Sequence, residues 1–156
     1  MNTENAVMYF LIGVGTGVLT CLMFKTLLKL KRNRVWHYQY NPATKLDIQI
    51  IAQTLETLNN PGYWDKSSDR LCIPDKRQSL FCTLAFVSRE LTGKYEHWGT
   101  VSQELRKTIE EKYAERWSEH PIMDFNSHPD TKHQDILNIL QTTKDKLESR
   151  AKIQKL

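Results

Sequence analysis

The sequence predicts an all-α protein in which a single transmembrane helix precedes a small cytoplasmic domain of four helices. Three observations predict this class: an uncharged apolar run near the N-terminus, apolar residues at three- and four-residue spacing farther on, and no convincing alternating strand pattern. With 156 residues, 40% hydrophobic and 26% charged, the chain has the size of one domain and the composition of neither a disordered tail nor a polytopic membrane protein. We divide it into an anchor with a basic stretch (1–34), a linker (35–46), a helical domain (47–142) and a charged tail (143–156).

The predicted transmembrane helix covers residues 6–24, which read AVMYFLIGVGTGVLTCLMF and contain no charge. At about 1.5 Å per residue this run spans roughly 28 Å, the thickness of the hydrocarbon core. A secretory signal peptide would carry positive charge before the run and a small-residue cleavage site after it, and the sequence has neither. A core helix of a soluble domain would show a polar face. The membrane-spanning interpretation is therefore preferred.

The net charge of +4 is concentrated next to this run. Residues 35–156 contain 17 basic and 17 acidic side chains, so they lack the basic surface that nucleic-acid binding requires. The +5 charge between positions 25 and 34 predicts a cytoplasmic flank, which places the N-terminus outside and the domain in the cytoplasm. We expect contacts with the lipid bilayer from Lys25, Lys29, Lys31, Arg32, Arg34 and the interfacial Trp36.

Gly13 and Gly17 form a G-x-x-x-G pattern inside the run. Such a pattern allows two helices to approach closely, which would give a homo-oligomer through the membrane helix. Glycine is also common in membrane helices without any such role. The sequence therefore allows both self-association through these glycines and a membrane helix without it.

The rest of the chain predicts four helices. The first begins at the N-cap Thr44 and carries Ile48, Ile51, Leu55 and Leu58, and the second, from about 79 to 91, is apolar nearly all round and should be the central one. A third helix should open with a capping box of Thr100 and Gln103 and continue to Trp117, where Pro121 stops it. After a loop at 122–129, a last helix should begin near 131, bury Ile136, Leu137, Leu140 and Leu147, and fray from Lys144 onward.

The three cysteines and five histidines do not form a metal-ligand pattern, so we expect neither a metal nor another cofactor. Because Cys72 and Cys82 would face a reducing compartment, a disulfide is not expected between them. Apolar packing is the commonest fate of a cysteine such as Cys82. An enzyme with a loop-borne site of Trp64, Cys82, His97, Asn126 and His128 is the alternative, since functional residues concentrate in loops.

The tripeptide His128-Pro129-Asp130 resembles the signature loop of J-domains. These co-chaperones stimulate the ATPase of a heat-shock chaperone, and some carry an N-terminal membrane anchor. In a J-domain a basic helix runs directly into the tripeptide, whereas here Pro121 ends the predicted helix and residues 122–127 intervene. The resemblance implies a membrane-anchored co-chaperone as a further alternative.

Residues 47–142 resemble a short domain family of unknown function from actinobacteria and phages, which closes with Trp-Asn-Asp-x-Pro-x-Arg-Thr. Gly62-Tyr63-Trp64 is similar to its Gly/Trp turn, and residues 125–132, reading FNSHPDTK, are similar to its closing signature. Asn126 and Pro129 match that signature strictly, and Phe125 replaces the Trp. The resemblance implies an accessory protein of phage or bacterial origin and no particular activity.

The closing signature also has a physical interpretation. Asn126 and Pro129 would shape a tight turn, with the Asn side chain bonding nearby backbone. Phe125 stands between two prolines in a mostly polar segment, so we expect it to be buried against Trp117 and residues 80–87. The sequence as a whole predicts a membrane-anchored interaction module with an unknown protein partner, with the enzyme and co-chaperone as alternatives.

Overall fold

A computed structural model describes residues 41–67, 72–74 and 76–153, and the described part is all-helical. Its elements are five α-helices and one short 3-10 helix: α2 (Lys45–Asn59), α3 (Leu80–Thr92), α4 (Thr100–Lys112), η1 (Ala114–Arg116), α5 (Pro121–Ser127) and α6 (His133–Ile153). The only β-type pairing in this part is an isolated bridge between Trp64 and Gln78.

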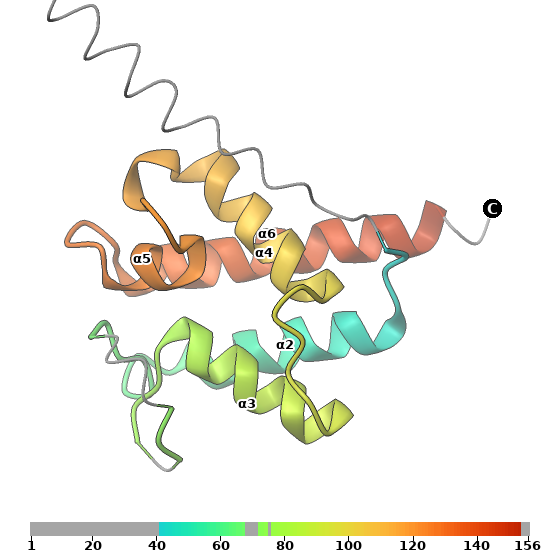
Figure 1. The fold of residues 1–156 in the computed structure, drawn as a ribbon, viewed down its shortest axis with the longest axis horizontal. Helices are drawn as coiled ribbons and strands as arrows, with labels where there is room; N and C mark the ends of the chain where they lie inside the picture. Colours follow the sequence, from blue (N-terminus) through green and yellow to red (C-terminus); the bar gives the residue numbers. More distant parts are fainter. Residues whose placement is uncertain (1–40, 68–71, 75, 154–156) are drawn as a thin grey trace, which may run out of the picture. The chain divides into compact units, whose positions relative to one another are not determined.

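The helices enclose one hydrophobic core. α6 packs against α2 on one side and α4 on the other, while α3 packs against α2 and α5. Figure 1 shows α2 and α6 running in opposite directions, with α5 near the start of α6. The predicted central position of residues 79–91 is not observed, because α6 packs against both α2 and α4 whereas α3 packs against α2 and α5 and ends near the exposed Leu91.

The N-termini of α2 and α3 follow from their capping residues. Thr44 accepts a hydrogen bond from the backbone of Asp47, and the Asp47 carboxylate accepts one from the Thr44 backbone, so the predicted N-cap forms a full capping box. Ser79 caps α3 by accepting from the backbone N–H of Cys82. At the other end of α3, Gly93 adopts a φ of 76°, the left-handed conformation that glycine tolerates best.

The helix α4 differs from its prediction at both ends. Gly99 is its N-cap and makes no side-chain bond, and the Gln103 amide donates to the Trp98 carbonyl, so the predicted capping box of Thr100 and Gln103 does not form. The helix ends at Lys112, five residues before Trp117, because Tyr113 leaves the helical region with φ −141° and ψ 45°.

A fifth helix, α5, occupies the segment predicted as a loop. Pro121 stands at its first position, where the missing N–H costs nothing and the fixed φ favours the helix, so this proline starts a helix as well as ending the preceding segment. Phe125 lies within α5, is fully buried, and stacks at 4.9 Å between ring centroids on Tyr113. The predicted burial of Phe125 is confirmed, with Tyr113 as its ring partner, while the predicted contact with Trp117 stays a prediction.

The last helix, α6, continues to Ile153 and does not fray at Lys144. Its buried residues are Ile136, Ile139, Leu140, Thr143 and Leu147. Leu137 is only partly buried, whereas Ile139, which is not among the predicted core residues, is fully buried. The helix therefore includes most of the stretch that the sequence predicts as a charged tail.

The predicted membrane-anchor features lie outside the described residues: Gly13, Gly17, Lys25, Lys29, Lys31, Arg32, Arg34 and Trp36. Among the helices that the structure describes, none is both long and apolar enough to cross a bilayer.

Replacing Phe125 with alanine should destabilise the domain strongly, because it empties a fully buried site between α3 and α4. We expect a loss of about 3 to 5 kcal/mol in the free energy of unfolding. His128→Ala is the control and should cost less than about 1 kcal/mol, since His128 is half-exposed and outside the core. Urea unfolding of residues 41–156, followed by circular dichroism, measures both, and equal losses would contradict the assignment.

Candidate functional site

Asn126 is the most highly connected polar residue of the predicted loop cluster. Its side chain is fully buried in α5. The amide oxygen accepts from the Trp64 indole at 2.9 Å and from the Leu80 backbone N–H at 3.0 Å. The amide nitrogen donates to the carbonyls of Asp65 at 3.0 Å and Lys66 at 3.1 Å. These four bonds use two acceptor sites and both donors of the amide.

The bonds of Asn126 show its role. The Leu80 N–H is one of the unsatisfied groups at the start of α3, so Asn126 caps that helix from a distance in the sequence. The other partners hold the turn at 64–66 against α5. The predicted bonding of the Asn126 side chain to nearby backbone is therefore wrong, because the four partners described above lie 46 to 62 residues away in the sequence.

Substituting Asn126 with alanine should be among the most damaging polar changes in the chain. It leaves the Leu80 N–H and the Trp64 indole N–H without their buried acceptor, and each unsatisfied group costs about 1 to 3 kcal/mol. Asn138→Ala is the matched control, because Asn138 is exposed and its amide oxygen accepts from Gln134 on the helix surface. Thermal unfolding measures both variants, and Asn126→Ala should have the lower melting temperature. Equal melting temperatures would contradict the structural role of Asn126.

The tripeptide at 128–130 forms the connection between α5 and α6. The ring Nδ1 of His128 accepts from the Asp130 backbone at 3.2 Å, and the Pro129 carbonyl accepts from the Lys66 ammonium group at 2.5 Å. Asp130 and Pro129 are exposed. The structure thus presents this loop at the surface, and its J-domain-like role stays a prediction.

Cys82 is unavailable as a nucleophile, which contradicts the thiol version of the enzyme hypothesis. It is 3% exposed and forms a disulfide with Cys72, with 5.2 Å between the two Cα atoms. The expectation that this pair stays reduced is therefore wrong in this structure. The disulfide holds the loop before α3 to the first turn of that helix.

His97 belongs to a different cluster from Trp64 and Asn126. Its ring lies 5.2 Å from that of Trp98 and 5.4 Å from that of His120, centroid to centroid. The buried guanidinium of Arg106 donates to the His97 carbonyl at 2.7 Å and lies 4.7 Å from the Trp98 ring centroid. Burial lowers the pKa of His97, and the positive charge of Arg106 and the neighbouring His120 lower it further. The predicted five-residue site is thus divided between two places.

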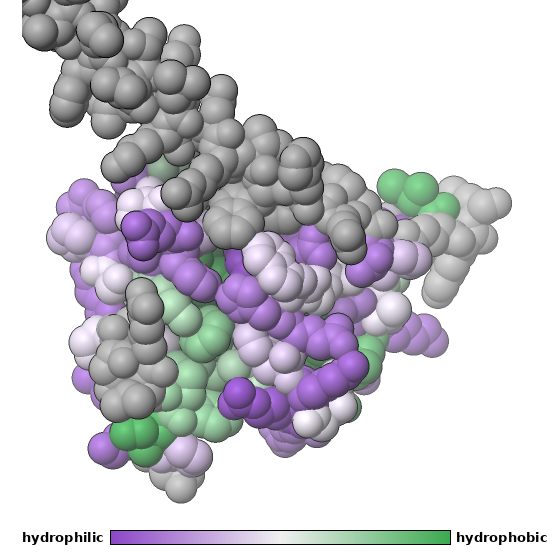
Figure 2. Space-filling view, viewed as in Figure 1, coloured by the Kyte–Doolittle hydropathy of each residue, from purple (hydrophilic) through white to green (hydrophobic). Residues whose placement is uncertain are grey.

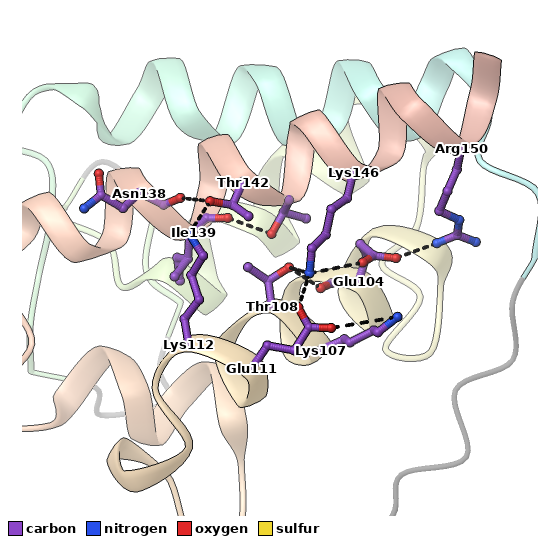
Figure 3. Close-up of polar contacts among 11 residues, drawn as sticks. Glu104, Lys107, Thr108, Glu111, Lys112, Asn138, Ile139, Thr142, Lys146 and Arg150 are labelled. Carbon is purple, nitrogen blue, oxygen red and sulfur yellow. Dashed lines mark hydrogen bonds and ion pairs between the residues drawn. The ribbon is translucent and has the colours of Figure 1, made fainter. Parts of the chain in front are cut away.

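A buried ion network between α4 and α6 was not predicted from the sequence. Glu104 is 4% exposed, and its carboxylate lies 2.6 Å from the Arg150 guanidinium and 3.8 Å from the Lys146 ammonium group. Figure 3 shows the Lys146 side chain extending from α6 between Glu104 and Glu111. The Lys146 ammonium group lies 2.5 Å from the Glu111 carboxylate. The spacing of these residues is the feature of the sequence that could have indicated the network. Positions 104, 108 and 111 share one face of α4, and positions 146 and 150 share one face of α6.

The two cations of this network should be partly redundant. Lys146→Met alone leaves Glu104 paired with Arg150, and Arg150→Met alone leaves it near Lys146, so each change should cost about 0.2 to 1 kcal/mol. The double variant leaves a buried carboxylate without a counter-ion, which costs about 3 to 5 kcal/mol, and should exceed the sum of the singles. Lys112→Met serves as the control with a single exposed bond to Thr142. Strict additivity in urea unfolding would contradict the network.

A groove with an apolar rim lies where the described chain begins. It has a volume of about 400 Å³. Its walls come from the start of α2, the end of α3, the loop before α4 and the first turn of α4, and include Asn41, Leu46, Lys94, Glu96, Trp98 and Val101. In the described part of the chain, no three His, Cys, Asp or Glu side chains converge as metal ligands.

Comparison with known proteins adds no family to these observations. No family model, no curated protein and no solved structure matches the chain. The resemblance to the Trp-Asn-Asp-x-Pro-x-Arg-Thr family therefore stays a prediction. The proposed function therefore rests on the sequence and the structure of this chain alone.

Proposed function

We propose that the chain is a single-pass membrane protein whose helical domain serves as an interaction or accessory module. The observation that carries the proposal is the uncharged run at 6–24, followed within ten residues by five basic side chains. An apolar segment of this length with such a flank is typical of a membrane anchor. Self-association through Gly13 and Gly17 belongs to the same proposal.

The chemistry of the domain supports a binding role over catalysis. Three of its buried polar side chains, those of Asn126, Arg106 and Glu104, have the bonds described above inside the fold. Cys82 is closed off by the disulfide. The remaining polar groups of the predicted enzyme site lie in two separate clusters, so they do not converge on one substrate position.

Two observations favour opposite orientations in the membrane. The basic residues at 25–34 favour a cytoplasmic domain, as the positive-inside rule states. The Cys72–Cys82 disulfide favours an oxidising compartment, because cytosolic thiols are normally kept reduced. We retain the cytoplasmic orientation as the proposal, since the charge bias acts directly on insertion, and treat the opposite orientation as the second candidate.

Alkaline carbonate extraction of cell membranes tests the anchor. The chain should stay in the membrane pellet, because an inserted helix is held by its buried apolar area and not by ionic contacts. A variant with Val14→Arg and Leu19→Arg should move to the supernatant, since each central arginine costs about 2.5 to 3.5 kcal/mol on insertion scales. Thr3→Arg, outside the run, is the control. Release of the unmodified chain would refute the proposal.

Protease treatment of sealed inverted vesicles then determines the orientation. A cytoplasmic domain should be digested without detergent, whereas a domain on the other side should be protected. Alkylation of the free thiols before and after reduction, on the same sample, reports whether Cys72 and Cys82 are joined in the cell.

A further inference from the structure

Exposed apolar side chains gather around the point where the domain begins. Leu46 is 38% and Trp98 51% exposed, and both line the groove that includes Asn41. Ile153, 69% exposed, lies one helical turn after Arg150, whose guanidinium donates to the Asn41 carbonyl at 2.6 Å. Figure 2 shows hydrophobic atoms projecting at that end of α6. We name Leu46, Trp98 and Ile153 the entry face.

We propose that the entry face contacts the surface of the bilayer, an inference that rests on the proposed membrane anchor. The run at 6–24 and Asn41 are separated by 16 residues, which reach at most about 55 Å when fully extended. The membrane is therefore present at high local concentration for this part of the domain. A face that carries Trp, Leu and Ile beside the tether is the one that a bilayer interface would accept.

The surroundings of Trp98 prepare it for this contact. Its ring is supported from below by the Arg106 guanidinium at 4.7 Å and from the side by the His97 ring at 5.2 Å. An aromatic ring held in place loses little conformational freedom when it enters the interface. Amphipathic aromatic rings of this kind favour the boundary between lipid and water.

Two ion pairs neutralise charges near the entry face. Glu96 is paired with Lys94 at 2.5 Å, and Arg150 is paired with Glu104 at 2.6 Å. Asp47 and Lys152 add one formal charge of each sign. The attraction to acidic headgroups therefore comes mainly from the five basic side chains at 25–34, so a membrane with phosphatidylglycerol is the expected partner.

Fluorescence quenching by brominated lipid tests the contact with the full-length chain. The chain is reconstituted into vesicles of phosphatidylcholine and phosphatidylglycerol at 4:1, with and without bromine near the headgroup end of the acyl chains. Trp36 is the other tryptophan expected at the interface, so Trp98→Phe should remove about half of the quenched intensity. Trp64→Phe is the control, because Trp64 is partly buried and bonded to Asn126, and it should leave that intensity unchanged.

A second pair of variants keeps Trp98 in place. Leu46→Ser combined with Ile153→Ser should reduce the quenching of Trp98, whereas Ile73→Ser, a comparably exposed isoleucine on the loop before α3, should not. Circular dichroism confirms that each variant is folded. Equal quenching of the unmodified chain and Trp98→Phe would overturn the proposal.

Flotation of the vesicles separates the two proposals. A chain that floats but shows no quenching of Trp98 keeps its anchor and refutes the entry-face contact. A chain that does not float refutes the anchor and the contact together. A change in Trp98 emission that follows the protein-to-lipid ratio and not the bromine would show that the face joins two copies of the chain, which also overturns the proposal.

Discussion

The side chain of Asn126 is the constraint on which the arrangement of the helices depends. One buried amide joins the turn at 64–66, the first residue of α3 and the short helix α5. Each of these segments alone is too short or too irregular to hold its position, since α5 has seven residues and the turn has no ladder. A short isolated helix is unstable in water, so α5 owes its stability to packing and to this amide.

The ion network around Glu104 serves the other half of the domain. Burying a carboxylate is unfavourable unless cations and hydrogen bonds compensate it, and here two residues from α6 supply that compensation. The arrangement explains why α6 stays helical to Ile153 although its last ten residues are strongly charged. Charges that would be solvated in isolation become helix–helix contacts once α4 lies beside them.

Local signals in the sequence predicted the local features of the fold. Thr44 was identifiable as an N-cap from its position before an apolar period, and the all-helical class follows from the same period. Pro121 was misinterpreted because proline both ends one helix and begins another, and sequence alone does not say which. The partners of Asn126 and Glu104 lie tens of residues away, so no window of sequence contains them. The predicted reducing compartment implies that Cys72 and Cys82 stay unpaired, whereas the fold places their Cα atoms 5.2 Å apart and joins them in a disulfide.

The start and the end of the described domain are linked through one residue. Arg150 binds the Asn41 carbonyl with one guanidinium nitrogen and the Glu104 carboxylate with another. The backbone at Asn41 is thereby joined to the last turns of α6 and, through Glu104, to the first half of α4. Hydrogen bonds from a charged donor are stronger than neutral ones. The start of the described domain is thus held by the same network that joins α4 to α6.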